Sequence, residues 1–289
     1  MVWDETTKET KSIAPQTKQP NFISDTEFEK WLFTTAEKDK IVCLLYGEDG
    51  TGKSPIPLSY LSEEDIKNGM CAVIIDLDGG CIPLVTRYYS DQCKKYDRNP
   101  NEVFIVRNPL VLTAKDGEEC IDYKETMNRI RRMIRYVKDN WEKKKIKFIV
   151  FDGLSTALKH AEQQMRLDKH LNADGGVQLR FWLVRNKIFT ETLEMIKSLP
   201  ISSFFIGHTD FILKGDETDS SVKIKTNAMV HQKIRCVKER NLDKSVILKA
   251  IIEKSKYNVR LEGRELIFCT VKPDGSYEWD GNKVLKEMI

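Results

Sequence analysis

The sequence has no apolar run of about 18 residues, the length at which a membrane-spanning helix becomes a candidate. Its first residues, MVWDETTKET, also lack the apolar segment of a secretory signal, so we expect neither a membrane protein nor a secreted one. None of the 7 cysteines belongs to a C-x-x-C pair. This argues against a zinc site and favours reduced thiols in a cytoplasm, the host cytoplasm if the protein is viral.

Neither sign of charge dominates the chain. Lys and Arg number 47 and Asp and Glu number 44 among 289 residues, which gives a formal charge of +3. This balance does not require a nucleic-acid partner, and it leaves room for a local basic surface. With 40% apolar and 31% charged residues, the composition supports a packed core and argues against global disorder.

The chain divides by composition into three parts. Residues 1–20 are rich in Thr, Lys, Gln and Pro, and we interpret them as a disordered leader. Residues 21–37 hold a capping box from Ser24 to Glu27 and an apolar side of Phe28, Trp31 and Leu32, which predicts a short N-terminal helix. Residues 38–289 form the core.

Buried strands and helices alternate from residue 41 onward. Continuous apolar runs, typical of strands buried on both faces, occur at 41–46, 71–77, 103–106, 147–151 and 203–207. Helical spacing of apolar residues is clearest over 121–142 and 177–198. Shorter β-like runs follow at 222–225, 234–237, 246–252, 266–270 and 277–279. The pattern predicts an α/β fold, with a mostly parallel central sheet flanked by helices and with C-terminal antiparallel strands.

A phosphate-binding motif follows the first strand. Its residues match G-x-x-x-x-G-K-[ST] without a gap: Gly47, Glu48, Asp49, Gly50, Thr51, Gly52, Lys53 and Ser54. The glycines let backbone N–H groups point at an anion, the following helix adds its positive end, Lys53 can reach the β- and γ-phosphates, and the Ser54 hydroxyl can bind Mg²⁺. Pro55 and Pro57 predict a tight or irregular start to that helix. Binding of a nucleotide without hydrolysis is an open alternative.

Polar side chains follow three of the predicted strands. Asp152 comes directly after KFIVF and can hold a Mg²⁺-bound water near Ser54. Asp78 follows CAVIIDL and can orient or deprotonate a water, and we favour it over Asp76 because it lies closer to the expected ligand crevice. His208 ends SSFFIG, where it can contact a γ-phosphate or serve as a solvated histidine.

These motifs together resemble the RecA-like branch of P-loop ATPases. The nearest likeness is to the compact RecA-like ATPases of phages and archaeal viruses, which are related to single-strand annealing and recombination proteins. The resemblance spans about residues 38–270 and rests on GEDGTGKS, IIDLDGG, FIVFDG, FFIGHTD and IIEKSK. It implies an oligomeric ATPase, in a ring or filament, that uses ATP and Mg²⁺. In this family the catalytic base is usually Glu, and Asp78 stands in that place one methylene shorter.

The resemblance also implies partner-facing residues. In IIEKSK, Lys254 and Lys256 match lysines that act on the ATP of a neighbouring subunit, although an edge strand protected by lysines is an equal alternative. Single-stranded DNA would bind two loops at about residues 155–180 and 210–232. The cations of those loops are His160, Arg166, Lys169, His170 and Arg180, then Lys214, Lys223, Lys225, His231 and Lys233. Phe33 to Ala36 resembles the family's F-x-x-A polymerisation motif, but an apolar helix end is the better interpretation.

Three functions compete at this point. The first is an ATP-dependent protein of DNA recombination, annealing or repair that acts on single-stranded DNA. The second is a RecA-like hexameric motor or a KaiC-like regulatory ATPase that acts on protein. The third is a small-molecule kinase, which the absence of a compact arginine-rich lid disfavours. Stimulation of ATP hydrolysis by single-stranded DNA separates the first from the other two.

Overall fold

The computed structural model describes residues 40–115, 117–172, 175–209 and 226–286. Contacts divide the chain into two units, Met1–Glu37 and Lys38–Ile289. The predicted leader, the N-terminal helix, the F-x-x-A motif and the run at 222–225 lie outside the described residues. Within the described residues no helix is long and apolar enough to cross a membrane.

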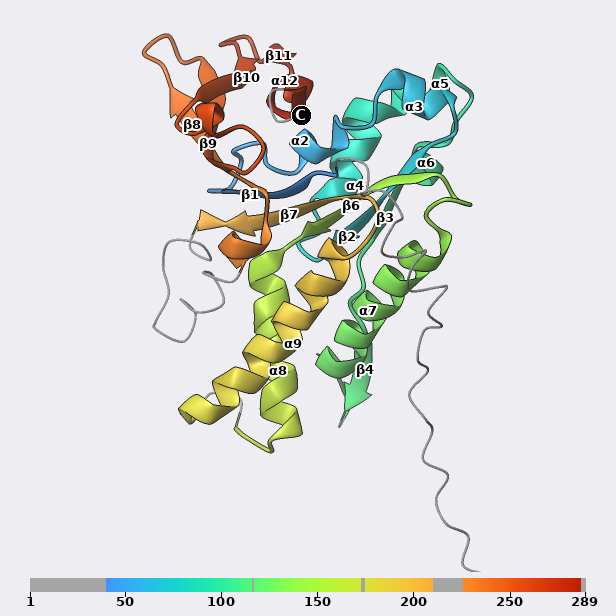
Figure 1. Ribbon diagram of the computed structural model, residues 1–289, viewed down its shortest axis with the longest axis vertical. Helices are drawn as coiled ribbons and strands as arrows, with labels where there is room; N and C mark the ends of the chain where they lie inside the picture. Colours follow the sequence, from blue (N-terminus) through green and yellow to red (C-terminus); the bar gives the residue numbers. More distant parts are fainter. Residues whose placement is uncertain (1–39, 116, 173–174, 210–225, 287–289) are drawn as a thin grey trace, which may run out of the picture. The chain divides into compact units, whose positions relative to one another are not determined.

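A nine-stranded sheet forms the centre of the second unit, in the order β11-β10-β9-β8-β1-β7-β6-β2-β3 (Figure 1). From β8 to β3 all neighbouring strands are parallel, whereas β9, β10 and β11 pair antiparallel. The fold class expected from the sequence is therefore confirmed. The strand bounds are β1 Val42–Gly47, β2 Cys71–Asp76, β3 Phe104–Arg107, β6 Ile146–Asp152, β7 Ser202–His208, β8 Gln232–Arg240, β9 Val246–Ser255, β10 Glu265–Val271 and β11 Tyr277–Trp279.

Helices cover both faces of this sheet because side chains of its central strands alternate between two cores. On β1, Leu44 belongs to the core under α7 Tyr123–Asn140, α8 Leu154–Asp168 and α9 Leu179–Lys197. Its neighbour Leu45 belongs to the core on the other face. That face carries short segments: α2 Pro55–Leu58, α3 Glu63–Lys67, α4 Cys81–Leu84, the π-helical turn η1 Val85–Tyr89, α5 Ser90–Lys94, α6 Pro100–Val103 and α12 Gly281–Lys286 (Figure 1).

Two elements differ from the sequence expectation. A separate hairpin, β4 Leu112–Lys115 with β5 Glu118–Ile121, stands between β3 and α7. Helix α8 occupies residues that we expected to belong to a DNA-binding loop. A single 3₁₀ turn, η2 Val259–Leu261, joins β9 to β10.

The helix after the phosphate-binding motif is a single turn. Helix α2 spans only Pro55–Leu58, with proline at its start, and the chain then turns toward α3. Pro55 and Pro57 lie in the first turn, where N–H groups have no partner within the helix, so proline is tolerated at both positions. The N–H of Ile56 bonds the carbonyl oxygen of Lys53, three residues earlier, at 3.3 Å, which fits the tight start predicted from the prolines. Because the helix is one turn long, the contribution expected from a long helix dipole is small.

Candidate active site

The carboxyl ends of four parallel strands meet at one edge of the sheet. Gly47 at the end of β1 pairs with His208 at the end of β7. Asp152 at the end of β6 pairs with Asp76 at the end of β2. This register brings the phosphate-binding loop, His208 and the acidic strand ends to the same edge, where ligands of parallel α/β sheets bind.

The phosphate-binding loop is shaped by its glycines and by the C-terminal strands. Gly50 and Gly52 have φ angles of 70° and 75°, in the left-handed region that glycine adopts without strain. At Gly52 an added Cβ would lie 2.9 Å from Cε2 of Phe268 on β10 and 3.0 Å from Cδ1 of Leu248 on β9. The loop conformation therefore depends on packing against strands about 200 residues later in the chain, which the motif alone cannot reveal.

The ammonium of Lys53 lies inside this loop. Its Nζ donates hydrogen bonds to the carbonyl oxygens of Gly47 at 3.0 Å and Glu48 at 2.6 Å. The residue is only 8% exposed, and burial lowers the pKa of the ammonium from its ordinary value. A buried cation held by carbonyls alone is stabilised by an anion, so the loop fits a phosphate group well.

Ser54 and Asp152 place two oxygens side by side. The Ser54 hydroxyl donates to Oδ2 of Asp152 at 2.7 Å. Asp152 is 4% exposed, and burial raises the pKa of its carboxyl group, which the hydrogen bonds from Ser54 and Cys81 oppose. Hydroxyl and carboxylate oxygens are the ligands that Mg²⁺ prefers, so the pair fits that ion.

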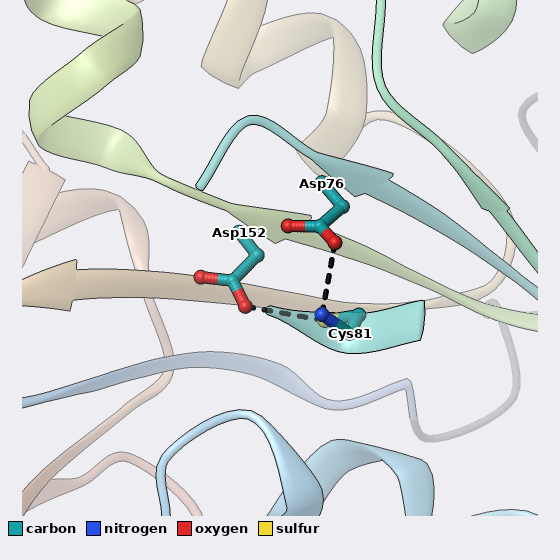
Figure 2. A group of neighbouring side chains, drawn as sticks. All are labelled: Asp76, Cys81 and Asp152. Carbon is teal, nitrogen blue, oxygen red and sulfur yellow. Dashed lines mark hydrogen bonds between the residues drawn. The ribbon is translucent and has the colours of Figure 1, made fainter. Parts of the chain in front are cut away.

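A buried thiol contacts the same carboxylate. Figure 2 shows Cys81 between Asp76 and Asp152. Its Sγ lies 3.3 Å from Oδ2 of Asp152, and its backbone N–H donates to Oδ2 of Asp76 at 2.9 Å. The candidate ligand atoms of these three residues lie within 4.8 Å of one another. Burial raises the pKa of the Cys81 thiol, and metal binding requires a thiolate, so the geometry suits Cys81 as a hydrogen-bond donor to Asp152.

Asp76 and Asp78 have different environments. Asp76 is 1% exposed, and its two oxygens accept the backbone N–H groups of Gly79 at 2.8 Å and Cys81. The side chain of Asp78 is 29% exposed, and its Oδ2 lies 3.4 Å from Nε2 of His208. The other ring nitrogen of His208 lies 3.2 Å from Oδ1 of Asp49. Asp76 therefore stabilises the turn after β2, while Asp78 lines the cavity.

One cavity of about 1000 Å³ joins these groups. Lys53, Ser54, Asp78, Asp152 and His208 all line it, together with the loop residues from Asp49 to Gly52. The cavity is also lined by side chains that the sequence did not point to: Arg87, Tyr88, Tyr277, Trp279 and Asn282. No local pattern marks these residues, because they come from η1 and from the region of β11 and α12, far apart in the chain.

The sequence also did not reveal an aromatic pair in the cavity or a second lysine near the phosphate-binding loop. The rings of Tyr88 and Tyr277 meet edge to face with centroids 5.5 Å apart, and both residues line the cavity. Lys238 of β8 brings its Nζ to 3.9 Å from the position that a Cβ on Gly50 would take. The site therefore has an aromatic wall, formed in part by Tyr88 and Tyr277, and a second cation, Lys238, near its phosphate-binding loop.

Lys254 and Lys256 lie apart from this cavity. Cys236 of β8 pairs with both Gly47 of β1 and Ala250 of β9. Lys254 comes four residues after Ala250, on the order of 13 Å back from the phosphate-binding edge along the strand. Its Nζ donates to the carbonyl oxygens of Asn227 at 2.5 Å and Val230 at 2.9 Å. These lysines do not reach the phosphate-binding loop of their own chain.

The prediction that residues 155–180 form a loop is wrong. Residues Leu154–Asp168 form helix α8, and its residues His160 and Arg166 are 6% and 8% exposed. The Arg166 guanidinium donates to Glu162 and to the carbonyl oxygens of Asn172 and Gly175 within the protein. Lys169, His170 and Arg180 remain exposed. In the second predicted loop, Lys214, Lys223 and Lys225 lie outside the described residues, and the Lys233 Nζ is 2.9 Å from Glu253.

No protein-family model and no curated protein matches this sequence. Among solved structures, the chain is similar to a KaiC-like protein from the archaeon Pyrococcus horikoshii OT3, with 14% identity, a TM-score of 0.46, and coverage of 81% of this chain and 87% of that one. It is also similar to the RadB recombinase, with 16% identity, a TM-score of 0.45, and coverage of 81% and 89%. The flagellar accessory protein FlaH from Methanocaldococcus jannaschii follows with 10% identity, a TM-score of 0.41, and coverage of 79% and 86%. Likenesses of this size carry no argument about what this chain binds or does.

Proposed function

We propose that this chain binds ATP with Mg²⁺ and hydrolyses it, as a RecA-like P-loop ATPase. One observation carries the proposal: a single cavity holds the Lys53 ammonium in a glycine loop, the Ser54–Asp152 oxygen pair, and the partly exposed carboxylate of Asp78. Phosphoryl transfer to water requires three parts of an active site: a loop that binds the phosphates, a site for a divalent cation, and a group that positions or deprotonates the water.

The loop and the oxygen pair bind and orient the nucleotide. Backbone N–H groups of residues 50–54 and the Lys53 ammonium would hold the β- and γ-phosphates, exchanging the carbonyl contacts of Lys53 for phosphate oxygens. Ser54 would ligate Mg²⁺, and Asp152 would hold it directly or through a water. When bound, Mg²⁺ neutralises the charge that develops on the β- and γ-oxygens.

Asp78 is the general base of this proposal. Its carboxylate would accept a proton from a water that attacks the γ-phosphorus, while the bond from that phosphorus to the β–γ bridging oxygen breaks and ADP leaves with the electron pair. His208 contacts the same carboxylate and lies at the end of the strand between β1 and β6. It would contact the γ-phosphate or hold Asp78 in place. The aromatic wall of the cavity, with Tyr88 and Tyr277, would receive the nucleoside.

The target of the ATPase is proposed to be single-stranded DNA, in recombination, annealing or repair. Exposed Lys169, His170 and Arg180 at the α8 and α9 ends support it, since cations of this kind contact phosphates. The burial of His160 and Arg166 removes two of the cations expected to contact DNA, so the second candidate, a motor or regulator that acts on protein, stays in competition.

ATP hydrolysis by wild type, Lys53→Ala and Lys143→Ala tests the activity. Lys143 is an exposed lysine after α7 and serves as the matched control. We expect Lys53→Ala to fold, because the loop is mainly backbone, and to lose nearly all turnover. Lys143→Ala should keep it. Normal turnover in a folded Lys53→Ala protein contradicts the proposed site.

The same assay with and without single-stranded DNA tests the target. Stimulated turnover in the wild type, lost as salt rises, supports the DNA proposal because phosphate contacts release counterions. Hydrolysis that DNA leaves unchanged overturns the DNA target while leaving the ATPase intact.

A further inference from the structure

The carboxylate of Asp78 is held from two sides. The hydroxyl of Thr156, in the first turn of α8, donates to Oδ1 of Asp78 at 2.7 Å. His208 approaches the opposite oxygen, with Nε2 at 3.4 Å from Oδ2. An ionised carboxylate only accepts hydrogen bonds, so the Thr156 hydroxyl is the donor and Oδ1 the acceptor. The two oxygens are thereby made inequivalent.

The backbone before Thr156 permits this contact. Helix α8 begins directly after Asp152 through Gly153, whose φ of 103° is in the region that only glycine adopts readily. A Cβ on Gly153 would lie 2.8 Å from Oδ1 of Asp78 and 2.9 Å from Cβ of Leu77. Glycine therefore lets the first turn of α8 lie against Asp78, which brings Thr156 within hydrogen-bonding distance.

We propose that Thr156 is a positioning residue for the general base: by occupying Oδ1 of Asp78 it fixes the carboxylate plane and leaves Oδ2, the oxygen beside His208, to take the proton from the attacking water. This inference rests on the proposed ATP hydrolysis and adds a residue to it. A hydrogen bond from α8 to Oδ1 fixes the plane of the Asp78 carboxylate and thereby the position of Oδ2, the proton acceptor.

Capping of the helix does not account for the Thr156 hydroxyl. Gly153 is the N-cap of α8 and makes no side-chain cap bond, and the hydrogen bond that Thr156 donates goes to Asp78 on another element. The neighbouring Ser155 is a suitable comparison, because its Oγ is buried and has no hydrogen-bond partner in the part of the chain that the structure describes. Removing the Ser155 hydroxyl changes the same helix turn without touching Asp78.

Steady-state ATP hydrolysis by Thr156→Val, Thr156→Ser and Ser155→Ala tests the role. Valine keeps the shape and removes the donor, so kcat should fall by about tenfold or more while KM changes by less than about threefold. Serine restores the donor and should recover most of kcat. Ser155→Ala should behave as wild type. Equal losses in the valine and serine variants, or a rise in KM with kcat unchanged, overturn the inference.

The Asp78→Asn background separates positioning from general structural damage. If Thr156 acts through Asp78, Thr156→Val should cause no further loss once the base is removed. A full additional tenfold loss in the double variant contradicts the inference even if the single variant is impaired. Should the wild type itself fail to hydrolyse ATP, the proposed function falls. Should Lys53→Ala abolish a hydrolysis that Thr156→Val leaves intact, only the role of Thr156 falls.

Discussion

Asp76 ends strand β2 and Asp78 lies two residues later, yet their different surroundings indicate different roles. Both oxygens of Asp76 accept backbone N–H groups in a buried turn. Asp78 lines the cavity together with His208 and accepts a hydrogen bond from the Thr156 hydroxyl. The sequence could favour Asp78 only because it lies past the strand, closer to the expected ligand crevice. It could not show the contact with Thr156, since the two residues come from separate elements.

Substitution of each aspartate by asparagine tests this division. Asp78→Asn keeps the shape and removes the base, so ATP affinity should be retained while turnover falls by about 10²-fold or more. Asp76→Asn replaces one acceptor by an NH₂ group facing a backbone N–H, which should lower the free energy of unfolding by about 1–3 kcal/mol. Turnover of the folded Asp76→Asn protein should change little. ATP binding, steady-state turnover and thermal unfolding measure the three quantities, and a larger loss of turnover in Asp76→Asn reverses the assignment.

Among the elements, the buried parallel strands were the most predictable. Each of the five apolar runs became a strand within a residue or two of its expected bounds, because a strand covered on both faces needs apolar side chains throughout. The β4–β5 hairpin was missed because each strand has only four residues: LTAK alternates over too short a stretch to stand out, and EECI does not alternate. Helix α8 was missed although Leu154, Ala157, Leu158, Ala161 and Met165 recur at helical spacing, because the family resemblance pointed to a loop there.

Substitution of Arg166 tests whether this residue of α8 stabilises the fold or binds DNA. Its guanidinium bonds Glu162 on the same helix and two carbonyls of the following segment, Asn172 and Gly175. Arg166→Ala leaves these acceptors without a partner and should lower the free energy of unfolding by about 2–4 kcal/mol. The control Lys169→Ala removes an exposed cation near the end of the same helix and should cost less than about 0.5 kcal/mol. Denaturant unfolding measures both. An Arg166→Ala protein of normal stability that has lost DNA stimulation would restore the residue to the DNA-binding role.

At the scale of the whole molecule, the antiparallel extension of the sheet has two ends with different surroundings. Its β9 and β10 strands pack against the phosphate-binding loop through Leu248 and Phe268. Lys254 lies near the other end of β9 and Lys256 directly follows that strand, both away from the loop. The sequence identified these lysines by a motif, but their distance from the loop depends on strand order, which a linear pattern does not contain.

Because Lys254 and Lys256 cannot reach the phosphates of their own chain, any contribution they make to hydrolysis must be to a neighbouring copy, which requires an oligomer. Cations supplied in this way stabilise charge on the γ-phosphate. We expect the rate per subunit to rise with protein concentration. Mixing Lys53→Ala with Lys254→Ala/Lys256→Ala subunits should restore part of the activity, because one chain supplies an intact loop and the other intact lysines. Mixing Lys53→Ala with Asp78→Asn subunits is the control. It should restore no activity, because Lys53 and Asp78 serve the cavity of their own chain and each variant therefore leaves its own cavity inactive. Lys254 also bonds carbonyls of its own chain, so folding of the lysine variant is checked first by circular dichroism. If mixed oligomers form and the first mixture shows no rescue, the lysines have no role between subunits.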